Sequence, residues 1–224
     1  MLWSERLHLE PLGDQAVLAT FAEEAGAARF AAAVRQANPP WLMDVVLAYV
    51  TVAVFFDMDE ANSESVTAAL RQMRLPRSLA PGRLHLIPCC YERNLDLQRV
   101  AELTRLTADE VIRFHHSLEY TVFAIGFSPG FPYLGYLAEE LSGVPRLDRP
   151  RVRVEPGSIG VAGRQTGIYP GATPGGWNLI GQTPLELVHL SDGYFPIRPG
   201  DRVRFRRIDD AEFRQLQGQR LLVD

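Results

Sequence analysis

The sequence predicts an α+β protein with two domains, a small α+β domain over residues 1–82 followed by a β-barrel domain over residues 83–224. Two observations carry this prediction. The composition changes near residue 82, because the first part holds 16 alanines and 3 glycines whereas the second holds 7 alanines and 15 glycines. Short strand-like segments separated by Gly and Pro then run from Tyr120 to Ile208, which is typical of a closed or nearly closed barrel.

The first domain shows alternating strand and helix patterns. Two short strand segments flank a turn at Gly13, and a helix is predicted over residues 23–36, ended by an Asn-Pro-Pro sequence. The apolar run 45–56 is rich in Val, Thr and Phe and predicts two further strands. A second helix is predicted to begin after Asn62, whose side chain suits the N-cap position.

The second domain is predicted to open with a strand over residues 84–88 and two short helices. The first helix is expected over residues 95–104 with Asn94 as its cap. The second begins at Thr107, which forms a capping-box pattern with the glutamate three residues later. The tail over residues 209–224 is predicted to be a polar helix or a loose end.

The charge composition excludes several classes of function. The chain has 23 basic and 27 acidic side chains, giving a net charge of −4, and a nucleic-acid binder usually needs a concentrated basic surface. All of the basic residues are Arg, and the sequence contains no Lys. A P-loop lysine, a Schiff-base lysine and a biotinyl-lysine are therefore excluded on this chain.

The sequence also suggests where the protein works. The first residues show no charged head followed by an apolar run, so that no signal peptide is expected. The longest apolar run, 45–56, is too short to span a membrane. The two cysteines, Cys89 and Cys90, are adjacent, and on a strand they point to opposite faces, which disfavours a disulfide or a shared metal site. We therefore expect a cytoplasmic protein without a membrane span or a metal site.

Two motifs resemble functional signatures and are rejected on physical grounds. The segment Gly126–Gly130 matches the Gly-x-Ser-x-Gly nucleophile elbow around Ser128, but the residue after the serine is Pro129, which has no N–H for an oxyanion. The predicted helix pair before residue 118 could pass for a helix-turn-helix, but its second helix is acidic. We therefore interpret Ser128 as a turn residue and expect no DNA binding.

The Gly-rich loops of the second domain are the strongest local signal. Residues 127–135, 163–170 and 173–177 each combine Gly or Pro with an aromatic side chain. Such loops can form anion-binding nests and stacking walls. They are equally what tight barrel turns require, so composition alone favours neither interpretation.

A series of motifs in this domain resembles the 5-oxoprolinase B-subunit family, a carboxyltransferase-like family that includes allophanate hydrolase subunit 1 and a sporulation-kinase inhibitor. The motifs cover about residues 84–208 in the family's order and spacing, and the first domain fits the family's small α+β domain. They are Gly126-Phe-Ser-Pro-Gly-Phe-Pro-Tyr-Leu-Gly135, Pro145-Arg-Leu147, Pro150-Arg151, Gly157-Ser-Ile-Gly-Val-Ala-Gly163, Gln165-Thr-Gly-Ile-Tyr-Pro170, Pro174-Gly-Gly-Trp177 and Pro199-Gly-Asp-Arg-Val203.

The resemblance implies a fold, a partner and a reaction. The barrel is expected to be cyclophilin-like, and the chain is expected to be a hydrolase subunit that is inactive without its partner. With a protein like the 5-oxoprolinase C subunit it would use ATP, together with Mg, to activate the lactam 5-oxoproline, and the A subunit would complete ring opening to L-glutamate. Two alternatives stay open: a regulatory inhibitor of a sensor histidine kinase, and a subunit of an allophanate or urea carboxylase-hydrolase system.

One segment departs from the family pattern. The family usually has a Gly-containing loop after the first tyrosine of this domain, whereas here Tyr91 to Leu97 is two residues shorter and lacks glycine. Asp96 still aligns with the family's aspartate and His115 with its Leu-His position. We expect Asp96 and His115 to form a general acid–base pair if the two helices bring them together. The alternative is that His115, on the inward stripe of its helix, is a core or capping histidine.

The remaining candidate residues lie in or beside the Gly-rich loops. Because the chain has no Lys, we expect arginines to bind the phosphate groups. Arg146, Arg151 and Arg164 lie next to these loops. A carboxamide and a hydroxyl can hydrogen-bond an amide substrate, and aromatic rings can wall it. The alternatives are that Gln165 and Thr166 satisfy backbone groups in a barrel turn and that Trp177 is core packing. The substrate-binding residues that we predict are Arg146, Arg164, Gln165, Thr166, Tyr169, Gly175, Gly176 and Trp177.

Overall fold

The computed structural model describes residues 7–222 and divides the chain into two compact units, Met1–Pro81 and Gly82–Asp224. The boundary that the composition predicts lies one residue later. The N-terminal stretch on which the expectation of no signal peptide rests lies outside the described residues. Within residues 7–222, no helix is both long and apolar enough to cross a membrane.

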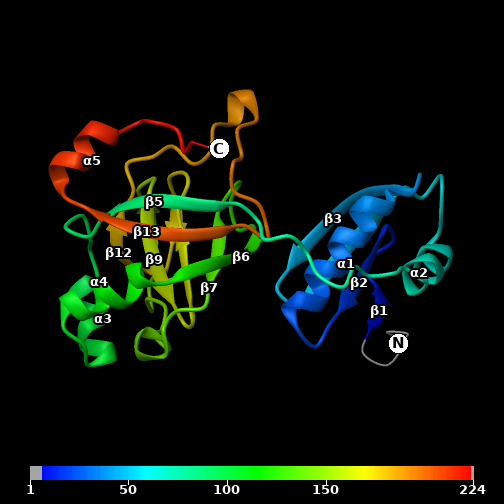
Figure 1. Ribbon diagram of the computed structural model, residues 1–224, viewed down its shortest axis with the longest axis horizontal. Helices are drawn as coiled ribbons and strands as arrows, with labels where there is room; N and C mark the ends of the chain where they lie inside the picture. The colour runs from blue at the N-terminus through cyan, green and yellow to red at the C-terminus, as the bar shows by residue number, and fades with distance from the viewer. Residues whose placement is uncertain (1–6, 223–224) are drawn as a thin grey trace. The chain divides into compact units, whose positions relative to one another are not determined.

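The first unit is a four-stranded antiparallel sheet with two helices, in the strand order β1-β2-β4-β3 (Figure 1). The predicted turn at Gly13 joins the first two strands, and the apolar run after residue 44 forms the other two, as expected. The elements are β1 (His8–Pro11), β2 (Ala16–Thr20), α1 (Glu24–Ala37), β3 (Leu42–Ala48), β4 (Thr51–Phe56) and α2 (Ser63–Arg71).

Both helices of the first unit contribute to a single hydrophobic core on one face of this sheet. Alternate residues of β4 from Val52 to Phe56 are fully buried there, together with Phe30 of α1 and Leu70 of α2. The predicted cap is confirmed, since the Asn62 side chain accepts a hydrogen bond from the backbone N–H of Ser65 at 2.9 Å.

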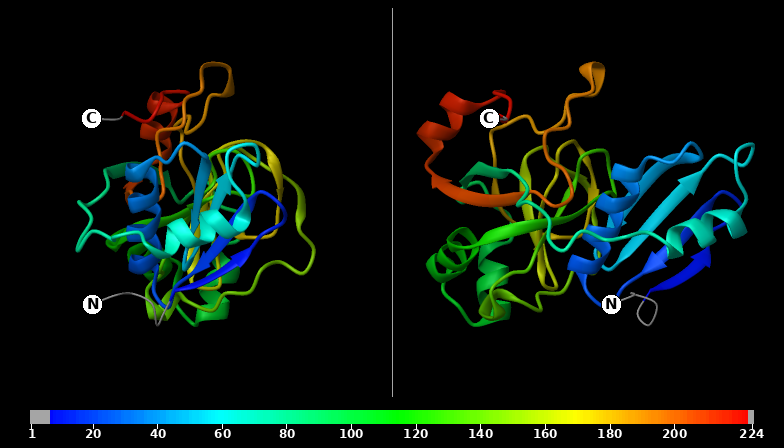
Figure 2. Two further views of the ribbon diagram at one scale, coloured as in Figure 1. Left: turned by 90° about the vertical axis from the view of Figure 1, so that its right-hand side faces the viewer. Right: turned by 45° about the vertical axis from the view of Figure 1, so that its right-hand side comes forward.

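The second unit is a closed seven-stranded barrel, which confirms the predicted α+β class with a barrel in the second domain (Figures 1 and 2). The strand order is β10-β7-β6-β13-β5-β12-β9, and β13 pairs with β5 in parallel. The barrel strands are β5 (Leu84–Cys90), β6 (Glu119–Ile125), β7 (Pro132–Gly135), β9 (Ser158–Ala162), β10 (Gln165–Ile168), β12 (Asn178–Gln182) and β13 (Arg202–Ile208).

Two helices join β5 to β6 and pack on each other and on the barrel wall, namely α3 (Leu97–Thr104) and α4 (Ala108–Ser117). The helix α3 begins two residues later than predicted, but the Asn94 side chain still accepts a hydrogen bond from the Leu97 N–H. The predicted capping box of Thr107 and Glu110 is present at the start of α4.

The remaining elements lie outside the barrel sheet. A two-stranded sheet pairs β8 (Arg151–Val154) with β11 (Thr173–Gly175), and β11 lies in one of the Gly-rich segments. Short 3-10 turns occupy η1 (Glu139–Leu141) and η2 (Leu190–Asp192). The predicted polar helix of the tail is α5 (Asp210–Leu216), whose buried Phe213 packs beside Cys90.

The adjacent cysteines lie on opposite faces of β5, as the strand pattern predicts. Cys89 points into the barrel core, whereas Cys90 packs against Ile208 and Phe213 on the other side. Both are free thiols. Burial raises the pKa of the Cys89 thiol well above its usual range, so that this sulfur stays protonated and acts as an apolar core atom.

Candidate active site

Three of the predicted site residues line one pocket at the turn between β9 and β10. The pocket has a volume of about 450 Å³ and is bordered by Arg146, Arg164 and Gln165. The rest of its lining is the tyrosine ring of Tyr136 and small or apolar residues, namely Gly143, Val144, Pro145, Ala162 and Gly163.

The walls of this pocket are held together by backbone hydrogen bonds between segments that are distant in the sequence. The Gly163 N–H donates to the Val144 carbonyl at 2.7 Å, and the Gly143 N–H donates to the Gly163 carbonyl at 2.6 Å. Gly163 has a φ of 59°, a left-handed conformation that suits glycine, and this turns the chain so that Arg164 follows at the rim. The Gly-rich turn is therefore both a barrel turn and one wall of a pocket.

The pocket is electrostatically one-sided. Arg146 and Arg164 are the charged residues in its lining, and no Asp or Glu is among the described residues that border it. The Arg164 guanidinium carbon lies 4.2 Å from the centre of the Tyr136 ring, a cation–π arrangement that restrains the side chain. A pocket of this kind favours a small anionic ligand.

The two polar residues predicted to read an amide lie on opposite faces of β10. Gln165 borders the pocket, whereas Thr166, one residue along the strand, is fully buried inside the barrel. The Thr166 hydroxyl donates to the Gly160 carbonyl at 3.0 Å and lies 2.9 Å from Nε2 of His115. Its hydrogen bonds are made inside the core, so the prediction that Thr166 contacts substrate is corrected.

His115 is a core residue held in one tautomer. Since the Thr166 hydroxyl uses its hydrogen on a carbonyl, it accepts from Nε2–H of His115, and Nδ1 then accepts from the Tyr91 hydroxyl at 2.7 Å. Burial lowers the pKa of His115 to about 3, with a smaller effect from His116. The ring is therefore neutral at physiological pH and makes no contact with solvent.

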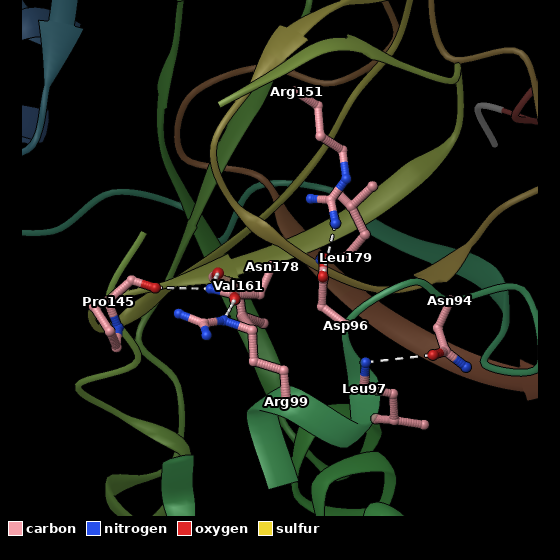
Figure 3. Close-up of polar contacts among 9 residues, drawn as sticks. All are labelled: Asn94, Asp96, Leu97, Arg99, Pro145, Arg151, Val161, Asn178 and Leu179. Carbon is pink, nitrogen blue, oxygen red and sulfur yellow. Dashed lines mark hydrogen bonds and ion pairs between the residues drawn. The ribbon is translucent and has the colours of Figure 1, made fainter. Parts of the chain in front are cut away.

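Asp96 does not pair with His115, which corrects the expected acid–base pair. The Asp96 carboxylate lies at the start of α3, where one oxygen is 2.7 Å from Nη2 of Arg151 and the other accepts from the Leu179 N–H at 2.7 Å (Figure 3). These contacts tie the helix to β8 and β12. Both carboxylate oxygens are thus engaged in binding α3 to the barrel.

One nitrogen of the Arg151 guanidinium is a hydrogen-bond donor without a partner among the described residues. Its Nη2 is paired with Asp96, but its Nη1 is buried and has no hydrogen-bond partner among the described residues. Arg146 and Arg151 both act on the nearby Tyr169 hydroxyl: burial raises the pKa of Tyr169, while the Trp177 N–H and these two arginines oppose that rise. Of these two arginines, Arg146 borders the pocket, whereas the charge of Arg151 is offset by Asp96.

Asn178 positions the segment that carries Arg146, and sequence reasoning missed it. This fully buried amide donates from Nδ2 to the Pro145 carbonyl at 2.8 Å and accepts from Nε of Arg99 at 3.1 Å (Figure 3). Asn178 follows Trp177 at the start of a strand, and nothing in the local sequence indicates a partner 33 residues away.

The predicted aromatic wall is buried rather than presented to a ligand. Trp177 is 5% exposed and packs edge-on against Phe131, with ring centres 5.6 Å apart, and against Tyr133 at 5.9 Å. Gly175 is needed for packing, because a Cβ there would lie 2.5 Å from the Tyr169 hydroxyl oxygen. The prediction that Tyr169 and Trp177 wall the substrate is corrected: they pack in a buried cluster that includes Ala162 of the pocket lining. The Gly176 carbonyl accepts a hydrogen bond from the Leu147 N–H.

Neither a serine nucleophile nor a metal cluster is found beside the pocket among the described residues. Ser128 lies in a turn, with its N–H donating to Gly126 and its carbonyl accepting from Phe131, in line with its interpretation as a turn residue. Among residues 7–222, no group of three or more His, Cys, Asp or Glu side chains is placed to hold a metal ion. Arg146 and Arg164 can bind anionic groups at the pocket.

Comparison with known proteins identifies the family. The family model "Carboxyltransferase domain, subdomain C and D" matches residues 7–192. The chain is 36% identical over 230 residues to the 5-oxoprolinase B subunit of Bacillus subtilis (strain 168), covering 93% of this chain and 95% of that protein. The chain belongs to the 5-oxoprolinase B-subunit family.

Further relatives agree with this membership. The 5-oxoprolinase B subunit of Haemophilus influenzae is 40% identical over 169 residues, covering 73% of this chain and 78% of that protein. The crystal structure of TTHA0988 superposes with a TM-score of 0.78 at 36% identity over 88% of this chain, which corresponds to 40% of that longer protein. The family model begins in the first unit, so that the resemblance extends beyond the barrel motifs.

Proposed function

We propose that this chain is the B subunit of an ATP-dependent 5-oxoprolinase of the cytoplasm, and that with a partner like the C subunit it activates 5-oxoproline for ring opening to L-glutamate. Family membership supports the subunit role, since the curated relatives are named as B subunits of 5-oxoprolinase. A protein like the A subunit would complete the reaction.

The observation that carries the proposal is the pocket of Arg146, Arg164 and Gln165. 5-Oxoproline has one carboxylate and one secondary amide within a five-membered ring. A guanidinium is suited to the carboxylate, and a carboxamide can donate to the lactam carbonyl and accept from the lactam N–H. The pocket volume of about 450 Å³ is ample for a molecule of this size.

The chemistry explains why two arginines would be useful. A lactam carbonyl is resonance-stabilised and reacts slowly with water. When its oxygen takes the γ-phosphoryl group of ATP, ADP leaves and the ring carbon becomes open to water. The negative charge of the transferring group needs cations, which Arg146 and Arg164 supply on a chain without Lys, alongside the Mg²⁺ that accompanies ATP.

The exposure of both arginines supports a site shared between two chains. Arg146 and Arg164 are exposed on this chain, so that water reaches them freely. Phosphoryl transfer to a weak nucleophile requires that water be kept away from the γ-phosphate. We infer that the partner protein closes the pocket and contributes to binding ATP.

The test is to assay this chain and its C-subunit-like partner separately and together for ATP hydrolysis with and without 5-oxoproline. We expect hydrolysis only from the mixture and only with 5-oxoproline. Stimulation by urea or allophanate instead would favour the carboxylase-hydrolase alternative. Robust 5-oxoproline-dependent turnover by this chain alone would contradict the shared site, and inhibition of a sensor histidine kinase without any turnover would favour the regulatory alternative.

A further inference from the structure

A second and larger cavity lies away from the candidate active site, beside β5. It has a volume of about 570 Å³. We call it the β5 groove, and its apolar lining consists of Leu84, Leu86, Pro88, Leu185, Leu216, Leu221 and Leu222. Figure 1 shows β5 running beside β13, with the C-terminal segment on the same side of the barrel as β5. The groove therefore separates one edge of β5 from the tail.

This edge of β5 is open over most of its length. The β13 partner pairs with β5 from Leu84 to Cys90, whereas β12, on the other side, pairs with it only at Cys90, opposite Gln182, within the described residues. The pairing of β5 with β12, which closes the barrel, thus consists of one residue pair among the described residues. The strand edge from Leu84 to Pro88 faces the groove instead of another strand.

The register shows which backbone groups are left at this edge. The Arg202 N–H donates to the Arg83 carbonyl, so the backbone groups of the odd-numbered β5 residues point toward β13. Those of Leu84 and Leu86 consequently point the other way, into the groove. Pro88 has no N–H, as is common for proline on an edge strand.

The side chains beside the edge favour an apolar and acidic occupant. Leu86 is 54% exposed and Leu222 is 83% exposed, which is unusual for leucines that border a cavity. Four arginines and no Asp or Glu are among the described residues that line the groove, these arginines being Arg83, Arg202, Arg206 and Arg220. The last three pair with carboxylates outside the groove lining, but Arg83 has no ion pair in the part of the chain that the structure describes.

We propose that an extended segment of the partner protein, with apolar residues and at least one Asp or Glu, adds a strand to β5 in this groove. An open edge offers main-chain hydrogen bonds to such a segment, and the leucines and arginines select its side chains. One strand residue occupies a volume set by the strand spacing of about 4.8 Å, the sheet spacing of about 10 Å and the rise of about 3.3 Å. The groove volume of about 570 Å³ therefore holds roughly four residues of strand. This matches the length of the open edge. The identity of the partner, a protein like the 5-oxoprolinase C subunit, rests on the proposed function.

The test combines hydrogen exchange with a binding titration. Exchange at the Leu84 and Leu86 amides of the wild-type chain is measured alone and with the C-subunit-like protein encoded in the same genome. We expect these amides to exchange more slowly in the complex, by about tenfold or more, because each gains a strand hydrogen bond. Leu86→Arg is expected to raise the dissociation constant by about tenfold or more.

Leu103→Arg is the matched control, since Leu103 is 46% exposed on α3, away from the groove. It should bind the partner as the wild type does. The exchange measurement uses the wild-type chain and does not depend on the folding of a variant. A complex that leaves both amides unprotected and tolerates Leu86→Arg overturns the inference.

The remaining outcomes separate this inference from the proposed function. An active complex with an unprotected edge contradicts the inference alone, whereas a protected edge without 5-oxoproline-dependent ATP hydrolysis contradicts the proposed function alone. The absence of any complex contradicts both. Protection of the edge without the partner, by self-association or by added dodecanoate, assigns the groove to a second copy or a small amphiphile and overturns the inference.

Discussion

Gln165 and Thr166 are adjacent on β10, and their side chains have different surroundings. Thr166 is buried, and its hydroxyl lies between His115 and the Gly160 carbonyl, whereas Gln165 borders the pocket. The same local sequence thus supplies one structural group and one candidate binding group, because successive residues of a strand face opposite sides.

This alternation predicts that substitutions of Thr166 and Gln165 affect different properties, namely the stability of the chain and the activity of the complex. Thr166→Val should lower the free energy of unfolding by about 1–3 kcal/mol, because it leaves buried polar groups unpaired. Gln165→Ala should leave the melting temperature nearly unchanged but lower the activity of the complex with the partner by about tenfold or more. Thermal denaturation and kcat/KM distinguish the two. Equal losses of stability in both variants would place Gln165 in the scaffold.

His115 predicts a specific pH dependence of stability. Its pKa is about 3 in the folded chain and near the ordinary 6.5 in the unfolded chain. Below pH 6.5 the unfolded state therefore binds a proton that the folded state does not, and the folded state loses stability as the pH falls. The expected slope is about 1.4 kcal/mol per pH unit between pH 6 and pH 4.

The measurement is urea denaturation of the wild type and of His115→Gln between pH 4 and pH 8. The variant lacks this titrating group, so the difference in stability between the two proteins should shrink as the pH falls. A difference that stays constant with pH would show that His115 does not titrate in this way.

At the scale of elements, Trp177, Phe131 and Tyr169 pack in one buried cluster with Ala162, a residue of the pocket lining. Trp177→Ala should destabilise the second unit by about 3–5 kcal/mol, since it removes a large buried side chain. Any loss of partner binding or activity should then follow the loss of folded protein. If Trp177→Ala melts like the wild type but loses activity, the ring contacts a ligand after all.

Local patterns were sufficient to predict most elements, whereas contacts between distant segments were not. The caps at Asn62 and Thr107 depend on residues three positions away, and both are present. The contact of His115 with Thr166 joins residues 51 positions apart, and that of Asp96 with Leu179 joins residues 83 apart. Because barrel closure sets these distances, motif spacing suggested functional roles for side chains that instead hold the barrel together.

The pocket residues were predictable for a related reason. Arg146 lies in a loop and Arg164 in a turn, where side chains reach the surface, and Gln165 follows that turn as the first residue of β10. Their roles could be inferred from residue type and from position in the loops. Asn178 could not be found in this way, because its task of holding the Pro145 carbonyl is visible only in the folded barrel.

At the scale of the whole molecule, the chain combines a well-packed barrel with two features directed outward. One is the positively charged pocket at Arg146 and Arg164, and the other is the open edge of β5. Both would be completed by another chain. We therefore propose that this pocket recognises the substrate of an enzyme that is active only as a complex.

The most direct test of this claim is the 5-oxoproline-dependent ATPase rate of the complex with the C-subunit-like partner, measured for Arg146→Gln, Arg164→Gln and the control Arg149→Gln. Arg149 is an exposed arginine near Arg146 that does not line the pocket. We expect kcat/KM to fall by about tenfold or more for each pocket variant, the scale of a lost charge-assisted hydrogen bond, and to stay close to that of the wild type for Arg149→Gln. Pocket variants that assemble and turn over like the control would contradict this proposal.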